Sequence, residues 1–173
     1  MTTTRRVRPE ACRTSTTTVV SSAPRSRSTL STGYALKGSC AADWPAASAS
    51  IGTQASPHLA INPTNRKHLS AVWLQDSGLN GASRGAGGMV SFDGGLAWQP
   101  LASAFTRCSG GTPANGGDYA RMHEIVTAVT GSGTVFQLAS VSSGDFATTF
   151  ARSALLLGRS SDGGRNWDET GIL

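Results

Sequence analysis

The chain has 173 residues, only 14% of them charged, and a formal net charge of +5. The charge is uneven: residues 1–37 hold seven basic residues and one acid, whereas residues 38–173 hold eight basic and nine acidic residues. A nearly neutral body argues against a nucleic-acid-binding module. No apolar run approaches the ~20 residues that span a bilayer.

Residues 1–37 are expected to form a basic, disordered tail. The segment is rich in Ser and Thr, poor in apolar residues, and has no aromatic residue before Tyr34. It therefore cannot bury enough surface to offset the entropy of ordering. It also lacks the apolar stretch of ~7–15 residues that a signal peptide needs, because Thr18-Val19-Val20 is too short.

Residues 38–173 read as a body of short strands that contains an internal repeat. The first unit, about 57–100, has predicted strands at 57–61, 68–74, 89–92 and 97–100, with a Gly-rich loop over 77–88. The second unit, about 123–170, has predicted strands at 124–129, 134–141, 153–160 and 166–168. Four short strands joined by hairpins in a unit of this length are typical of a propeller blade. The sequence predicts an all-β fold, an incomplete β-propeller of two four-stranded antiparallel blades.

Each unit carries the pattern Ser-x-Asp-x-Gly-x-x-Trp at its third hairpin. Glycine supplies the positive φ that a tight turn requires, and the Asp carboxylate can accept hydrogen bonds from backbone N–H groups of the turn. The Trp offers an apolar face to the sheet. This chemistry needs no substrate, so a structural role is predicted for the residues of both motifs: Ser91, Asp93, Gly95 and Trp98, then Ser160, Asp162, Gly164 and Trp167.

These motifs resemble the Asp boxes of bacterial sialidase-like (BNR repeat) β-propellers. The resemblance covers about residues 38–173 and extends to the segments 56–65, 71–76, 83–85, 107–111 and 115–121. It implies a secreted glycoside hydrolase that acts on sialylated or related glycans, with the Asp boxes on the face away from the ligand. A propeller closes with about 4–8 blades, so the remaining blades are expected from a longer chain.

The resemblance also implies an arginine triad, an acid/base Asp and a Tyr–Glu nucleophile pair. No Arg-Ile-Pro motif is present, and the two tyrosines are Tyr34 and Tyr119. One cluster gathers suitable groups: Arg121 could clamp a carboxylate, and a carboxyl group could act as acid or base. The alternative to a catalytic site is that this cluster is only a polar loop between the blades. The resemblance is also weaker here, because relatives carry Asp-Pro at the position of His123-Glu124. The candidate catalytic residues are Asp118, Tyr119, Arg121 and Glu124.

Other site chemistries find little support. His58 and His68 lack nearby carboxylates at ligand spacing, so no metal site is predicted. The glycines between Gly78 and Gly88 are not followed by Gly-Lys-Ser/Thr, so no phosphate loop and no cofactor is expected. Arg84 in this loop could reach a ligand, or simply lie exposed. Three cysteines leave open either a Cys40–Cys108 disulfide or unpaired thiols.

The sequence thus predicts a sialidase-like propeller that engages glycans. Glycoside hydrolysis is implied by the resemblance alone, and two blades by themselves are expected to be inactive. The alternative is a non-catalytic secreted β-propeller that binds carbohydrate or protein. A full catalytic set in further sequence would favour the enzyme, and its absence would favour the binding protein.

Overall fold

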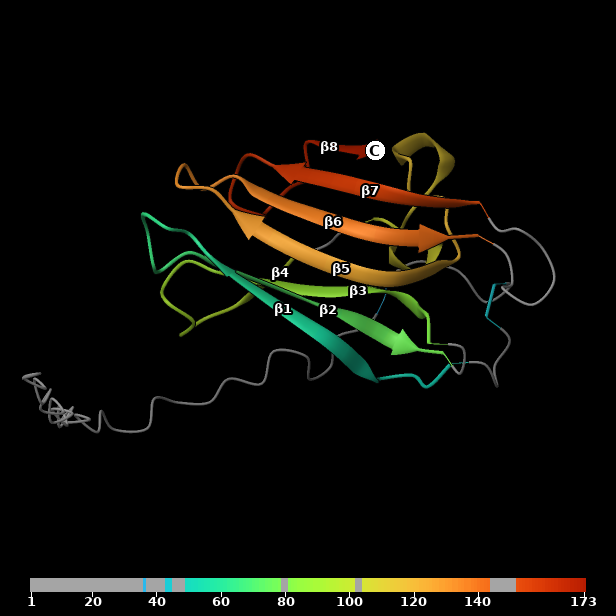
Figure 1. The fold of residues 1–173 in the computed structure, drawn as a ribbon. Coiled ribbons are helices and arrows are strands. Elements are labelled where there is room, and N and C mark those ends of the chain that lie inside the picture. The colour runs from blue at the N-terminus through green and yellow to red at the C-terminus, as the bar shows by residue number, and fades with distance from the viewer. Residues whose placement is uncertain (1–35, 37–42, 45–48, 79–80, 102–103, 144–151) are drawn as a thin grey trace, which may run out of the picture.

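The computed structural model describes residues 36, 43–44, 49–78, 81–101, 104–143 and 152–173. These residues form an all-β fold of eight antiparallel strands in one open sheet, which confirms the predicted class (Figure 1). The strands are β1 (Gln54–Ile61), β2 (Leu69–Ser77), β3 (Ser83–Ser91), β4 (Gln99–Pro100), β5 (Arg121–Val129), β6 (Val135–Ser142), β7 (Ser153–Ser160) and β8 (Glu169–Ile172). Two short 3-10 helices, η1 (Arg107–Ser109) and η2 (Pro113–Asn115), lie between β4 and β5.

The predicted loop over residues 77–88 is wrong for its second half, because β3 already begins at Ser83. Glycines make this strand suitable for close packing rather than for flexibility. A Cβ at Gly87 would lie 2.3 Å from the indole of Trp73, the residue that pairs with it across the ladder. Glycine is therefore the residue that lets the Trp73 ring lie flat against β3.

The sheet consists of two four-stranded repeats, β1–β4 and β5–β8. Within each repeat the strands pair as consecutive antiparallel neighbours. Between the repeats, the ladder contains one pair among the described residues, Ser83 of β3 with Met122 of β5. The two repeats therefore share almost no backbone hydrogen bonds, and contacts between their side chains determine how one repeat packs on the other.

One apolar core supplies that packing. β2 contributes Val72 and Leu74, which lie in one cluster with Ile125 of β5 and Val141 of β6. Phe105, 1% exposed, comes from the connection between the repeats and joins the same cluster. Burial of these side chains stabilises the association of the repeats by the hydrophobic effect.

Polar contacts join the repeats near the β1–β2 turn. The Thr64 hydroxyl donates to the Gly131 carbonyl at 2.6 Å, and the His68 ring bonds the Gly163 carbonyl at 3.0 Å. The backbone N–H of Thr127 donates to Nδ1 of His58 at 3.2 Å. Each of these hydrogen bonds joins a residue of the first repeat to a residue of the second. Because hydrogen bonds are directional, they restrict the relative orientation of the two repeats more than apolar packing does.

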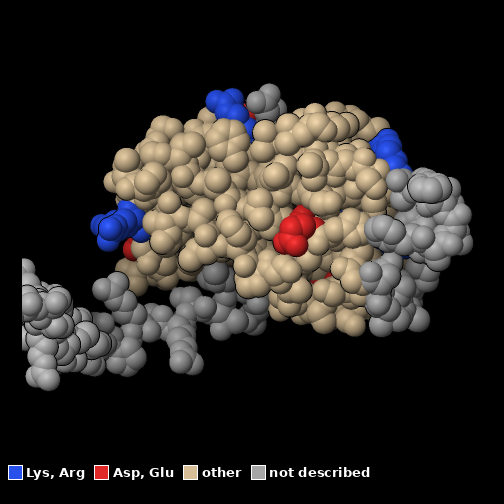
Figure 2. All heavy atoms as spheres, viewed as in Figure 1, with Lys and Arg blue, Asp and Glu red and all other residues tan. Residues whose placement is uncertain are grey.

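The predicted tail lies outside the described residues, apart from Leu36, so its disorder stays a prediction. Among the helices of the described part of the chain, none has the length and apolarity that a membrane crossing requires. Figure 2 shows a face on which Lys, Arg, Asp and Glu are sparse.

Candidate functional site

The two Asp boxes have the same hydrogen-bond geometry. In the first, Oδ1 of Asp93 accepts from the N–H groups of Leu96 and Ala97, each at 2.9 Å. The Ser91 hydroxyl donates to the same Oδ1 at 2.8 Å and accepts from the N–H of Gly95 at 2.9 Å. The carboxylate therefore organises the turn, which is the function predicted from the motif.

In the second box, Oδ1 of Asp162 accepts from the N–H groups of Arg165 and Asn166, again at 2.9 Å. The Ser160 hydroxyl donates to this oxygen and accepts from Gly164, both at 2.9 Å. Hydrogen bonds to the ionised form, above all from the backbone at Asn166, hold the pKa of Asp162 well below its ordinary value. The same cause, led by the backbone at Ala97, lowers the pKa of Asp93.

The motif tryptophans differ between the two boxes. The Trp98 indole donates to the Gly95 carbonyl within its own turn at 3.0 Å. The Trp167 ring packs instead beside the core, and its indole nitrogen has no hydrogen-bond partner among the described residues. Both boxes keep the same Ser and Asp hydrogen bonds and the same pair of positive-φ glycines, so the shape of the turn does not require one particular Trp packing.

The Asp boxes lie at one end of the strands, and the predicted catalytic cluster lies at the other. The boxes connect β3 to β4 and β7 to β8, whereas the cluster begins β5. Met122 in β5 pairs with Ser83, the first residue of β3, and Ser91, the last residue of β3, opens the first box. The length of β3 therefore separates the two ends.

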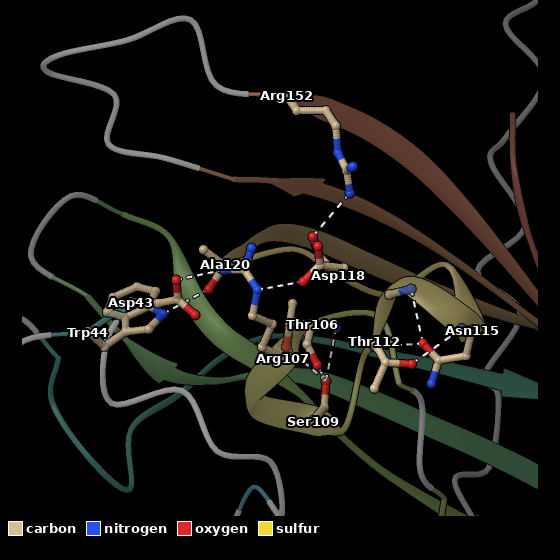
Figure 3. A network of polar contacts seen from close by, with 11 residues as sticks. Asp43, Trp44, Thr106, Arg107, Ser109, Thr112, Asn115, Asp118, Ala120 and Arg152 are labelled. Atoms are coloured by element: carbon tan, nitrogen blue, oxygen red, sulfur yellow. Dashed lines mark hydrogen bonds and ion pairs between the residues drawn. The ribbon is translucent and has the colours of Figure 1, made fainter.

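Arg107 of η1 is the centre of a polar network at the end opposite the boxes (Figure 3). Its Nε donates to Asp118 at 2.7 Å, and one of its Nη nitrogens donates to Asp43 at 2.6 Å. These two carboxylates raise the pKa of Arg107, with the hydrogen bond to Asp118 as the largest cause. About a third of the Arg107 and Asp118 side chains stays exposed, so the pair can still meet a ligand.

The structure does not assemble the four predicted catalytic residues into one site. Tyr119 is 2% exposed in the core, with the guanidinium of Arg152 4.4 Å from its ring centroid. Arg121 lies over the ring of Trp44, 5.0 Å from its centroid. Glu124 is exposed on β5, and Asp118 pairs with Arg107 as described above. The geometry accounts for Tyr119 and Arg121 as packing residues, and their catalytic roles stay predictions.

Arg84 is half-buried rather than free on a loop. Its guanidinium pairs with the buried carboxylate of Asp76 at 3.4 Å. Asp76 has a φ of +60°, in the left-handed region, and its Oδ1 also accepts from Gly52 N–H at 2.9 Å. The Gln75 side chain donates to this same oxygen at 2.8 Å. The pair braces the hairpin between β2 and β3.

Cys108 is disulfide-bonded and fully buried. It belongs to a small cluster with Trp44 and Ala82, beside the polar network. Its partner lies outside the described residues, as do both other cysteines, so the Cys40–Cys108 pairing stays a prediction.

Sequence reasoning missed Asp43, Trp44, Arg107 and Arg152 as members of this end. Arg107 and Asp43 are 64 positions apart, and no spacing rule brings them together. The pairing of Arg152 with the Tyr119 ring depends on how β7 follows β6, which a single sequence does not reveal. In the described part of the chain, no three His, Cys, Asp or Glu side chains gather in a way that could hold a metal ion.

The comparisons with known proteins leave the family open. No protein-family model matches this sequence. No curated protein matches it either, so the case for a family rests on the paired Asp-box geometry itself.

Proposed function

We propose that the two repeats are adjacent blades of a sialidase-like β-propeller, and that the chain engages glycans at the end opposite its Asp boxes. The observation that carries the proposal is the pair of Asp boxes. Two turns with the same Ser and Asp hydrogen bonds recur at the same position of successive four-stranded repeats. Radial repetition of such units is how propellers are built.

The burial of equivalent residues on the two repeats favours the presence of further blades. Ladder registers align Val72 of the first repeat with Leu138 of the second, and Ala86 with Leu155. Val72 and Ala86 are buried in the core shared by the repeats, whereas Leu138 is only half-buried and Leu155 is 47% exposed. The second repeat therefore leaves open the face that the first repeat buries, as a series of stacked blades requires.

The glycan proposal rests on polar groups that are accessible but held in place. Asp118 and Arg107 offer a carboxylate and a guanidinium, and the exposed Arg152 donates to the Asp118 carbonyl at 3.1 Å. Such pre-positioned groups suit sugar hydroxyls and carboxylates. Because Tyr119 is buried, hydrolysis is not proposed for these two repeats alone. The disulfide at Cys108 supports a secreted or extracellular location, where such bonds persist.

Titration of the full chain with sialyllactose, followed by NMR, tests the proposal. We expect shifts at the amides of Asp118 and Arg107, and binding at least fivefold weaker in Arg152→Ala. Arg66→Ala is the matched control, because Arg66 is an exposed arginine in the β1–β2 turn. Absence of binding to sialyllactose and to lactose would contradict the glycan proposal. A fluorogenic sialoside should stay intact, and its hydrolysis would favour the enzyme over the binding protein.

A further inference from the structure

A hollow of about 310 Å³ lies at the Asp-box end, opposite the proposed glycan surface. The β1–β2 turn, the β5–β6 turn and the second Asp box line it, so it lies between the two repeats. Its volume is at the small end of the range for ligand pockets. The side chains that decide its chemistry are Asn62, His68, Phe92 and Asp162.

Asn62 presents an unused donor to this hollow. The residue is 3% exposed, and its Oδ1 accepts from the Thr64 N–H and the Asn65 N–H at 2.9 and 3.1 Å. Two backbone N–H donors on one atom identify that atom as the oxygen, so the orientation of the amide is fixed. The Nδ2 group has no hydrogen-bond partner among the described residues. Most of the residue is buried, but Asn62 lines the open hollow, where a ligand or a water can accept from this nitrogen.

His68 presents an unused acceptor to the same hollow. The residue is 4% exposed, and its Nε2 lies 3.0 Å from the Gly163 carbonyl. A carbonyl can only accept, so Nε2 carries the proton, and Nδ1 of the neutral ring has a free lone pair. No described residue donates to Nδ1. Stacking on Phe92, at 4.9 Å between centroids, fixes the ring.

Gly133 leaves the space between these two groups open. A Cβ at this glycine would lie 3.8 Å from His68 Nδ1 and 3.9 Å from Asn62 Nδ2. The two nitrogens therefore border the same space, which contains no side chain because position 133 is glycine. A group that entered there would meet one donor and one acceptor together.

We propose that this hollow binds hydroxyl groups of a neutral sugar or polyol. A hydroxyl both donates and accepts, so it can satisfy His68 Nδ1 and Asn62 Nδ2, singly or through two neighbouring hydroxyls. Asp162 also lines the hollow, but both of its carboxylate oxygens accept hydrogen bonds within the Asp box. Phe92 also lines the hollow, with His68 stacked on its ring and the Arg165 guanidinium 3.8 Å from its centroid. The site is separate from the surface around Arg107 and does not depend on its function.

Titration of the full chain with methyl α-D-glucopyranoside, followed by NMR, tests the site. We expect shifts of the Asn62 side-chain amide and of the Gly133 and Gly163 backbone amides. Tetrahydropyran, the same ring without hydroxyls, should leave these signals unchanged. This comparison uses the unaltered chain, so it does not depend on the folding of any variant.

Two variants remove one partner each while keeping the local structure. Asn62→Asp retains the oxygen that organises the turn and removes the donor. His68→Gln retains a donor for Gly163 and removes Nδ1. Each should weaken sugar binding about five- to tenfold, the effect of one hydrogen bond, whereas Arg66→Ala in the same turn should not. The proposal is overturned by unmoved amides at millimolar sugar, by equal shifts with tetrahydropyran, or by unchanged affinity in both variants.

Discussion

The hydroxyls of Ser70 and Thr127 lie 2.8 Å apart in the interior and join β2 of the first repeat to β5 of the second. The Thr127 hydroxyl also donates to the Phe136 carbonyl at 3.2 Å, so it accepts from Ser70. Ser70 is fully buried and Thr127 is 4% exposed, which leaves no room for water to replace either partner. A buried polar pair thus fixes the register between two repeats whose backbones, in the part of the chain that the structure describes, pair at one ladder position.

Thr127→Val should reduce the free energy of unfolding by about 1–3 kcal/mol, because it leaves the Ser70 hydroxyl buried without an acceptor. Ser70→Ala combined with Thr127→Val should recover part of this loss, since neither group then lacks a partner. Urea denaturation of the two single variants and the double variant measures the coupling. Additive losses would show that the two hydroxyls do not interact.

Gly87→Ala should destabilise the first repeat by about 1–3 kcal/mol through overpacking. The added Cβ would lie 2.3 Å from the Trp73 ring, and that buried ring cannot move without disturbing β3. Gly171→Ala is the matched control in a strand, because a Cβ there meets nothing within 4 Å. Thermal melts followed by near-UV circular dichroism compare the two, and equal melting temperatures would contradict the packing account.

The Asp boxes should make the fold sensitive to acid. The pKa of Asp162 is lowered in the folded chain, so its contribution to stability is complete above the ordinary Asp pKa and is lost as the pH falls below it. The melting temperature of the unaltered chain should therefore fall between pH 5 and pH 3. Asp162→Asn should melt lower at pH 6 and show a smaller decrease on acidification. An unchanged pH dependence in this variant would exclude Asp162 as a source of the effect.

The disulfide at Cys108 makes the predicted pairing directly testable. Peptide mapping without reduction should recover a Cys40–Cys108 peptide. Cys12→Ala should keep the bond, and Cys40→Ala should lose it together with about 2–4 kcal/mol of stability. Recovery of a Cys12–Cys108 peptide would overturn the pairing.

Local chemistry made much of the fold predictable. The Asp boxes were recognised because Ser, Asp and Gly act within a few residues of each other, and the structure gives them the predicted hydrogen bonds. The strand β7 has the predicted limits, because in the sequence its apolar run follows a polar stretch and ends at the Asp-Gly-Gly of the second box. The start of β3 was missed because three glycines read as a loop, whereas in the structure Gly87 gives room to Trp73, Gly88 to Leu101 and Gly85 to Thr106.

The candidate site was harder to predict because its partners are distant in sequence. Arg107 binds a carboxylate 64 positions away, and Arg121 stacks on Trp44 from the same distant segment. Asn62 and His68 each read as a turn or strand residue, and only the packing of the second repeat reveals an amide and a ring nitrogen that face one space.

The two tryptophan environments have a consequence for how such repeats can diverge. One indole bonds within its own turn and the other packs against the side of the core, while the Ser and Asp bonds around them stay the same. Each turn keeps its shape through its own Ser, Asp and Gly residues, whichever way its tryptophan packs. Duplicated units can change nearly all of their remaining residues and still reverse the chain in the same way. A few positions, the Ser, Asp and Gly of each box, are then enough to keep the hairpin after the rest of the sequence similarity is lost.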